Sequence, residues 1–290
     1  MLSAPGFAPA KINLFLHVGP LGADGYHPVA SLMTFADVGD VLTIHDAHEF
    51  GFSIDGPFAA GLTADRDNLV IRARDAVLSR ADSPATPFHV NLTKNLPLAS
   101  GIGGGSADAA ALLRLLRPRF GLASQIEAEI AIDLGSDVAA CLLARPMIGR
   151  GRGEILSPPL RMPDLTAVLA NPGVASPTAE VYRAYDTAPH EDGGELAPLP
   201  PMSTPRDVAA VISSFRNDLE APAIRLQPAI GETLDLLASD PDCLLARMSG
   251  SGATCFALTA DAKGAAGLAE RLAAQRPQWW IRATNLRGSR

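Results

Sequence analysis

Residues 94–110 read KNLPLASGIGGGSADAA, and an alanine- and leucine-rich run follows directly. Gly101 and Gly103–Gly105 fall in this stretch, and each glycine costs about 1 kcal/mol relative to alanine inside a helix. We therefore expect a loop here, followed by a helix that opens at Ser106 and ends near Pro118. A glycine loop that leads into a helix offers unpaired N–H donors and the positive end of the helix dipole. The stretch predicts a site for a nucleotide or a phosphorylated ligand.

Other glycine motifs fit this loop poorly. No lysine follows the last glycine, so the loop is not the Gly-x-x-x-x-Gly-Lys-Ser/Thr phosphate loop. The dinucleotide fingerprint needs a strand just before the loop and an acidic residue about twenty positions after it, and the match is not convincing. A glycine-rich loop shaped only for packing stays open as an alternative.

The composition is that of an ordinary globular protein. The chain has 290 residues, of which 47% are apolar and 19% charged, which suits two domains or one large one. Thirty-one acidic residues oppose 24 basic ones, and this net charge of −7 disfavours a nucleic-acid partner. The three cysteines lie far apart and form no Cys-x-x-Cys pair, which indicates a reducing compartment and argues against a zinc site.

Nothing in the sequence predicts a membrane partner. No apolar stretch reaches the ~18 residues that a bilayer span requires. The N-terminus carries two prolines and no basic segment, which is unlike a secretion signal. We therefore expect a cytoplasmic protein.

The pattern of apolar residues predicts an α+β protein, because strands and helices alternate without a regular βαβ rhythm. Strands are expected at 11–18, 31–44 (with a hairpin turn at Val38–Asp40), 88–92, 165–170, within 246–258 and at 280–283. Helices are expected at 69–78, 124–134, 138–144, 230–239 and 261–275, the last with Asp261 as N-cap. A break at 156–163 predicts domains 1–158 and 159–290, and the composition of 187–206 predicts an exposed, mobile loop.

Several polar residues are candidates for a site, and each has a simpler explanation. Lys11 and Asn13 share one face of a strand, where a lysine is usually just solvated. Asp137 follows Gly-Ser and can serve as a helix N-cap, a role worth about 1 kcal/mol. Tyr26–His27 can be a turn with a half-buried aromatic ring. His45 and His48 have no third ligand nearby in sequence, so we expect no metal site.

Taken together and in order, these motifs resemble one family, the GHMP small-molecule kinases. The match runs over roughly residues 7–260 and is carried by the segments Ala8–Leu14, Asp24–His27, Asn95–Ser106, Gly135–Val138, Pro177–Thr178 and Ser249–Gly252. Within that superfamily, the first two segments are similar to those of the 4-diphosphocytidyl-2-C-methyl-D-erythritol kinases. The resemblance implies a two-domain α+β fold, with an N-terminal domain like ribosomal protein S5 domain 2 and a ferredoxin-like C-terminal domain.

The resemblance also implies an activity, the transfer of a phosphoryl group from ATP with Mg²⁺ to the 2-hydroxyl of a small substrate that carries a cytidine diphosphate. Lys11 and Asp137 match the catalytic positions. The ATP positions are Asn68, Lys94, Pro97, Leu98, Ala99, Ser100, Gly101, Ile102, Gly103, Gly104, Gly105, Ser106 and Asp108. The substrate positions are Asn13, Tyr26, His27, Asp137, Thr178, Tyr182, Gly250 and Gly252, with the two tyrosines expected to sandwich the cytosine. No protein ligand for a metal is implied, and we expect a monomer or a weak homodimer.

The sequence departs from the family pattern after the glycine loop, where Ala107 and Asp108 replace a common serine and asparagine. A carboxylate near ATP is unfavourable, although at a helix N-terminus it is favourable. Arg150 and Arg152 fit either a phosphate contact or a solvated turn. Two other functions stay open: a GHMP kinase for another alcohol, such as homoserine or mevalonate, and a non-catalytic nucleotide-binding protein. Because neither alternative alcohol carries a base, Tyr26–His27 disfavours the first.

Overall fold

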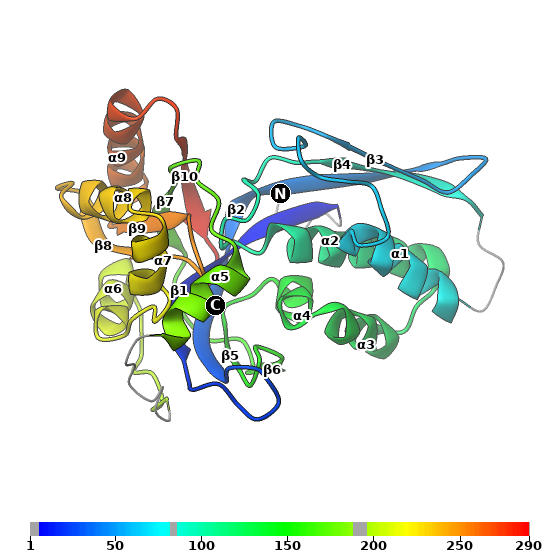
Figure 1. Cartoon of the computed structure of the whole chain (residues 1–290), viewed down its shortest axis with the longest axis horizontal. Helices are drawn as coiled ribbons and strands as arrows, with labels where there is room; N and C mark the ends of the chain where they lie inside the picture. The colour runs from blue at the N-terminus through cyan, green and yellow to red at the C-terminus, as the bar shows by residue number, and fades with distance from the viewer. Residues whose placement is uncertain (1–5, 82–85, 188–195, 290) are drawn as a thin grey trace. The chain divides into compact units, whose positions relative to one another are not determined.

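The computed structural model describes residues 6–81, 86–187 and 196–289 (Figure 1). Its strands are β1 Phe7–Val18, β2 Val29–Asp46, β3 Gly51–Asp55, β4 Phe88–Thr93, β5 Met147–Arg150, β6 Ile155–Leu156, β7 Leu165–Asn171, β8 Cys243–Met248, β9 Cys255–Thr259 and β10 Trp280–Leu286. Its helices are α1 Leu69–Arg80, α2 Gly104–Phe120, α3 Ser124–Leu134, α4 Ser136–Leu143, α5 Thr178–Asp186, α6 Pro205–Ser213, α7 Glu220–Leu226, α8 Ala229–Ala238 and α9 Ala262–Gln275.

The chain forms two compact units that interleave along the sequence. Unit 1 takes residues 1–11, 38–98 and 103–144, and unit 2 takes residues 12–37, 99–102 and 145–290. Strands β1 and β2 therefore each contribute one part to each unit, and the glycine loop is divided between the two units. The expected domains 1–158 and 159–290 divide the chain by sequence alone and stay a prediction.

Unit 1 is a small sheet with helices α1–α4 on one face (Figure 1). The second half of β2 pairs antiparallel with β4, from Val41 opposite Thr93 to Asp46 opposite Phe88, and β3 runs parallel to β4. Helix α2 forms the centre of this unit, because residues 107–113 are all buried. The helix that follows the glycine loop is thereby fixed to its surroundings along its second and third turns.

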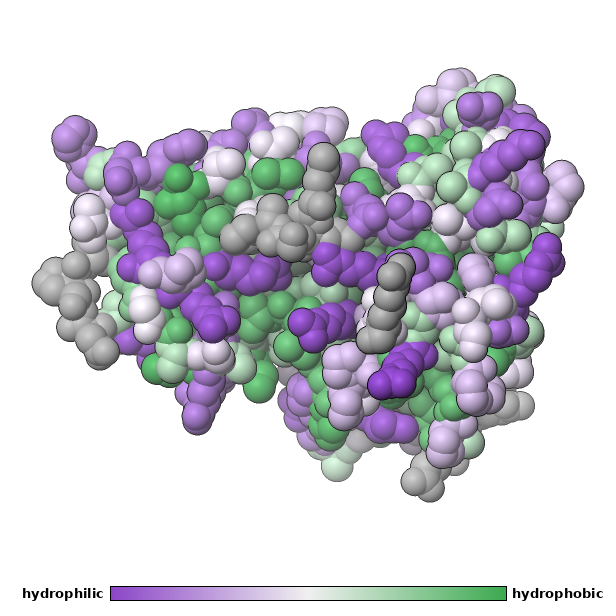
Figure 2. Space-filling view, turned by 180° about the vertical axis from the view of Figure 1, so that it is seen from behind, coloured by the Kyte–Doolittle hydropathy of each residue, from purple (hydrophilic) through white to green (hydrophobic). Residues whose placement is uncertain are grey.

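Unit 2 is built on the strand order β2-β10-β7-β9-β8. Strand β10 pairs antiparallel with β7 over its whole length, from Trp280 opposite Asn171 to Leu286 opposite Leu165, and β7 continues to β9. Helices α8 and α9 contact this sheet. On the surface, Figure 2 shows hydrophilic side chains spread among hydrophobic ones over the face opposite to that of Figure 1.

The expected hairpin at Val38–Asp40 is wrong, because β2 runs without a break from Val29 to Asp46. Gly39 has another function there. A Cβ at this position would lie 2.2 Å from the carbonyl oxygen of Ala8, so the glycine permits a close approach of the β1 backbone. Sequence alone does not distinguish a glycine needed for close approach from a glycine needed for a turn.

Other boundaries shift in ways that local chemistry explains. Helix α2 begins at Gly104 instead of Ser106, and Pro118 lies inside its last turn. Strand β1 is buried on both faces instead of one. Helix α9 begins after its expected N-cap, Asp261, whose side chain accepts a hydrogen bond from the Gly264 amide. Helix α6 was not expected, although Thr204 and Asp207 form a capping box around Pro205. Of the expected loop 187–206, residues 188–195 lie outside the described part of the chain.

Candidate functional site

Lys11 and Asp137 meet within unit 1, although 126 positions separate them in the sequence. The ammonium of Lys11 donates to Oδ1 of Asp137 over 2.8 Å. The lysine side chain is 7% exposed, whereas that of Asp137 is 45% exposed. A buried amine thus holds one oxygen of the carboxylate and leaves the group accessible to a ligand.

The expectation that Asp137 caps its helix is wrong. The N-cap of α4 is Gly135, whose φ of 153° suits glycine, and no side chain caps this helix. Asp137 lies one residue inside the first turn, where the helix dipole favours a negative charge. Its carboxylate is therefore directed to Lys11 instead of its own backbone.

The glycine loop ends in an uncapped helix N-terminus beside this pair. Gly103 is the N-cap of α2 with φ of 65°, and as a glycine it provides no side-chain acceptor. The Ala107 amide makes the first helical hydrogen bond, to the Gly103 carbonyl at 2.9 Å. A Cβ at Gly103 would lie 3.2 Å from Cε of Lys11, so the lysine stem passes next to the start of the helix. The amine, the carboxylate and the anion-attracting end of α2 are neighbours within unit 1.

Lys94 lies in a buried ion-pair triad with Asp40 and Asp108. Its ammonium is 2.5 Å from Oδ2 of Asp40 and 2.7 Å from Oδ2 of Asp108. The three side chains are at most 3% exposed. Asp40 also accepts hydrogen bonds from the backbone amides of Asn95 and Leu96, at 2.6 and 2.8 Å. The triad therefore connects strand β2 and the second turn of α2 to the start of the loop.

The triad explains the unusual aspartate at position 108. Burial raises the pKa of Asp108 well above its usual value; the Lys94 ammonium opposes this rise and Asp40 reinforces it. Burial lowers the pKa of Lys94, but the two carboxylates outweigh that effect and raise it overall. One amine thus serves two acids, and Oδ1 of Asp108 has no hydrogen-bond partner among the described residues.

Asn68, an expected ATP contact, caps helix α1. Its Oδ1 accepts from the Val70 amide at 2.9 Å, and its Nδ2 donates to the Thr63 carbonyl at 3.1 Å. Both functional ends of the amide are occupied within unit 1. The contact with ATP stays a prediction.

In unit 2, residues 99–102 of the glycine loop rest on the second glycine turn, Ser249–Gly252. Oγ of Ser249 donates to the Gly101 carbonyl at 3.1 Å. A Cβ at Gly250 would lie 2.6 Å from the same oxygen, which together with its φ of 56° explains why glycine is needed there. The expected contact of Gly250 and Gly252 with the substrate stays a prediction, and the geometry shows that the turn supports the glycine loop.

Two further expected substrate residues are anchored by hydroxyl groups of unit 2. The side-chain Nδ2 of Asn13 donates to Ser31 Oγ at 2.7 Å, and the backbone amide of Asn13 donates to Ser249 Oγ at 3.1 Å. Thr178 Oγ1 lies 2.9 Å from Ser251 Oγ. The second glycine turn thus contacts both residues, and sequence reasoning had assigned no role to its two serines.

The expected cytosine residues also lie in unit 2, on two elements. His27 Nδ1 donates to the Gly19 carbonyl at 2.9 Å, its Nε2 lies 3.3 Å from Asp186 Oδ1, and its ring lies 5.1 Å from that of Tyr182. The sequence reasoning missed Asp186. Asp186 lies at the end of α5, one turn after Tyr182, so helical spacing in the sequence could have identified it as a neighbour of that tyrosine.

Tyr26 is 53% exposed and carries a cation on one face of its ring. The Arg152 guanidinium carbon lies 3.8 Å from the ring centroid, and the same side chain binds Asp24 at 2.8 Å. Arg152 fits either a phosphate contact or a solvated turn from the sequence. The phosphate contact stays a prediction, and in the structure the side chain makes this cation–π contact from the turn. The tyrosine sandwich is likewise untested.

The described residues also include potential metal ligands and three cysteines. There, no three His, Cys, Asp or Glu side chains are grouped to hold a metal ion. The three cysteines are free thiols, and burial raises the pKa of Cys141 to about 12. Over the same ranges, no helix has the length and hydropathy of a membrane span.

Comparison with known proteins gives the family of this chain. The family model for the GHMP kinases N terminal domain matches residues 68–145, and that for GHMP kinases C terminal matches residues 204–278. The chain is 53% identical to the 4-diphosphocytidyl-2-C-methyl-D-erythritol kinase of Caulobacter vibrioides (strain NA1000 / CB15N), over 97% of this chain and 98% of that protein.

Solved structures agree. A crystal structure of a 4-(cytidine 5'-diphospho)-2C-methyl-D-erythritol kinase is similar with a TM-score of 0.78 and 32% identity, covering 98% of this chain and 99% of the other. The homoserine kinase of Cytophaga hutchinsonii has a TM-score of 0.68 at 18% identity, covering 97% and 93%, and shows the shared fold alone. The expected α+β GHMP kinase fold is confirmed, and the chain belongs to the 4-diphosphocytidyl-2-C-methyl-D-erythritol kinase family of GHMP kinases.

Proposed function

We propose that this chain is an ATP-dependent kinase that phosphorylates the 2-hydroxyl of 4-diphosphocytidyl-2-C-methyl-D-erythritol in the non-mevalonate route to isoprenoid precursors. The observation that carries the proposal is the 2.8 Å pair of Lys11 and Asp137 in the same unit as the uncapped start of α2. The relatives named above supply the identity of the acceptor.

The chemistry follows from the pair. The acceptor is an alcohol, which is a poor nucleophile while it holds its proton. Asp137 accepts that proton as the alcohol oxygen bonds to the γ-phosphorus and the bond from phosphorus to the ADP oxygen breaks, giving the 2-phosphate and ADP. Lys11 orients the carboxylate and stabilises charge on the transferring group, a step that depends mainly on positioning and electrostatics.

The nucleotide end follows from the helix. We propose that the amides of Gly104, Gly105 and Ser106 face the phosphates, because the first amides of a helix have no internal partner. ATP enters as its magnesium complex, and the described residues offer no cluster of protein ligands for the ion. The ammonium of Lys94 is held by two carboxylates, so we assign it to holding the loop, and its contact with adenosine stays a prediction.

We place the working enzyme in the cytoplasm, where free thiols persist, as a monomer or a weak homodimer with small-molecule partners only. The division into domains 1–158 and 159–290 is part of the same proposal.

An acceptor panel tests the proposed reaction. The purified chain is incubated with Mg-ATP and the cytidyl substrate, mevalonate or homoserine, and ADP release is followed together with ³¹P NMR of the product. We expect turnover with the cytidyl substrate and a kcat/KM at least about 100-fold lower with the others, since they leave the base site empty. Turnover of mevalonate or homoserine alone would assign the chain to another GHMP kinase. ATP binding with no acceptor phosphorylated would support the non-catalytic alternative.

Replacing Tyr26 with alanine tests recognition of the base. Arg152 covers one face of the ring, and we propose that the cytosine stacks on the other. Loss of one base–aromatic stack is worth about 1–3 kcal/mol, so we expect the KM for the cytidyl substrate to rise roughly 5- to 150-fold. Tyr26→Phe keeps the ring and is the matched control. An unchanged KM in Tyr26→Ala would remove this tyrosine from the base site.

A further inference from the structure

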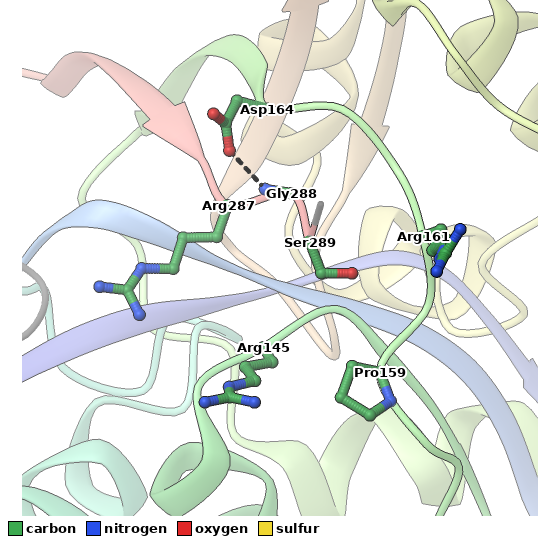
Figure 3. A pocket seen from close by; sticks show the side chains of 7 residues that line it. All are labelled: Arg145, Pro159, Arg161, Asp164, Arg287, Gly288 and Ser289. Carbon is green, nitrogen blue, oxygen red and sulfur yellow. Dashed lines mark hydrogen bonds between the residues drawn. The ribbon is translucent and has the colours of Figure 1, made fainter.

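A cavity of about 590 Å³ in unit 2 carries three arginines and one acid (Figure 3). Its lining comes from three distant parts of the sequence: Arg145, the connection from β6 to β7, and the residues after β10. The lining residues are Arg145, Pro159, Arg161, Asp164, Arg287, Gly288 and Ser289. None of them belongs to the catalytic or substrate positions assigned above.

The wall formed after β10 is held by its backbone. The Arg287 amide donates to the Phe35 carbonyl at 2.9 Å, and the Ser289 amide donates to the Met162 carbonyl at 3.0 Å. The Gly288 amide donates to Asp164 Oδ1 at 2.8 Å. A Cβ at Gly288 would lie 2.4 Å from the Met162 carbonyl oxygen, so only glycine fits this close contact. This wall of the cavity is therefore a fixed feature of the fold.

Positive charge predominates in the lining. In the described part of the chain, no carboxylate forms an ion pair with Arg145 or Arg161, and Asp164 already accepts from the Gly288 amide. Arg145 and Arg287 are close enough to repel each other. Burial is the main cause that lowers the pKa of Arg287; Asp37 opposes this, Arg145 lowers the pKa further, and Asp164 raises it by less. Such an excess of cations in a chain of net charge −7 favours an anionic ligand.

The lining also indicates what kind of anion fits. In the view of Figure 3 the guanidinium groups of Arg145 and Arg287 lie on one side and Arg161 lies on the other. Guanidinium groups bind phosphate oxygens through paired N–H donors. Groups on two sides suit an anion with two charged ends better than a single phosphate. Among the residues that line the cavity, none offers an aromatic or large aliphatic side chain on which a base could stack.

We propose that this cavity binds a small diphosphate, recognised through its charged oxygens alone. The site is separate from the proposed catalytic residues and does not depend on the proposed reaction. Its volume is within the range of ordinary small-ligand pockets.

Amide NMR of the full-length chain tests the site. Inorganic pyrophosphate is titrated at constant ionic strength into ¹⁵N-labelled protein, with inorganic phosphate and citrate as separate arms. The Gly288 and Ser289 amides report on this cavity, while the Gly104 and Gly105 amides report separately on the start of α2. We expect pyrophosphate to shift the first pair saturably, and to bind more tightly than phosphate or citrate.

The variant Arg145→Gln/Arg161→Gln removes the two guanidinium groups that have no carboxylate partner among the described residues. We expect it to weaken the pyrophosphate effect at Gly288 about 10-fold or more, with the effect at Gly104 unchanged. Arg282→Gln, an exposed arginine of β10 outside the cavity, is the matched control and should bind as the wild type does. No saturable shift at Gly288, equal binding of citrate, or full binding by the double variant would overturn the proposal. If the double variant does not fold, the same pyrophosphate titration is made with Arg161→Gln alone.

Discussion

Asp137→Asn is expected to lower kcat by about 10²- to 10⁴-fold, the usual contribution of a positioned general base. Asparagine has nearly the same shape and keeps an oxygen for the Lys11 ammonium, so the local structure should persist. It cannot take the proton of the acceptor hydroxyl. Among the described residues, Asp137 is held at Oδ1 alone, and because its side chain is 45% exposed, Oδ2 can meet that hydroxyl. ATP binding should be unchanged, because the amides of α2 do not depend on this carboxylate.

Single-turnover rates and the Kd for ATP, measured on the same preparations, separate chemistry from binding. Asp133→Asn is the matched control, since this carboxylate lies on the neighbouring α3, is 70% exposed and faces Arg80 at 3.6 Å. Such a surface pair contributes little, so the control should keep wild-type turnover. If Asp137→Asn turns over as fast as the control, Asp137 is not the base.

This pair shows what the sequence could predict. The order of the motifs predicts that Lys11 and Asp137 act together, and the structure brings the two side chains into contact although 126 positions separate them. Their part in a reaction stays a prediction. Local reasoning alone favoured a solvated lysine and a helix N-cap. Both explanations describe a residue by its neighbours in sequence, whereas the ion pair depends on how β1 and α4 pack within unit 1.

The errors have the same origin. Gly39 was expected in a turn because glycine is common there, but its conformation is extended and its function is close contact with Ala8. The sequence relates Asp108 only to ATP and the helix dipole. Its actual partner, Lys94, is itself shared with Asp40, which lies 54 positions away from the lysine. Pairings of this kind depend on strand register, which a single sequence does not fix.

Lys94→Met is expected to destabilise the protein by about 3–5 kcal/mol, the usual cost of leaving a buried charge without its partner. Methionine fills a similar space but removes the amine between Asp40 and Asp108, neither of which is more than 3% exposed. The loop should loosen as well, because Asp40 also holds the amides of Asn95 and Leu96.

Urea unfolding followed by circular dichroism measures this loss. Lys263→Met replaces an exposed lysine on α9 and is the matched control. We expect its urea midpoint to equal that of the wild type. Equal midpoints for the two lysine variants would show that the triad contributes nothing to stability.

We expect Asp108→Asn to stabilise the protein, by an amount that depends on pH. The pKa of Asp108 is raised in the folded state, so between its usual value of 3.8 and that raised value the folded chain binds more protons than the unfolded chain. The stability contributed by Asp108 therefore falls as the pH rises through this window. The raised pKa of Lys94 does not make the stability depend on pH in this window. At a pH well below 10.5, Lys94 is protonated in both the folded and the unfolded chain. Asparagine removes the repulsion from Asp40 and leaves a one-to-one pair of Lys94 with that acid. We expect the stability of Asp108→Asn relative to wild type to increase from about pH 4 towards neutral; a relative stability that decreases over this range would mean that Lys94 fully neutralises both acids.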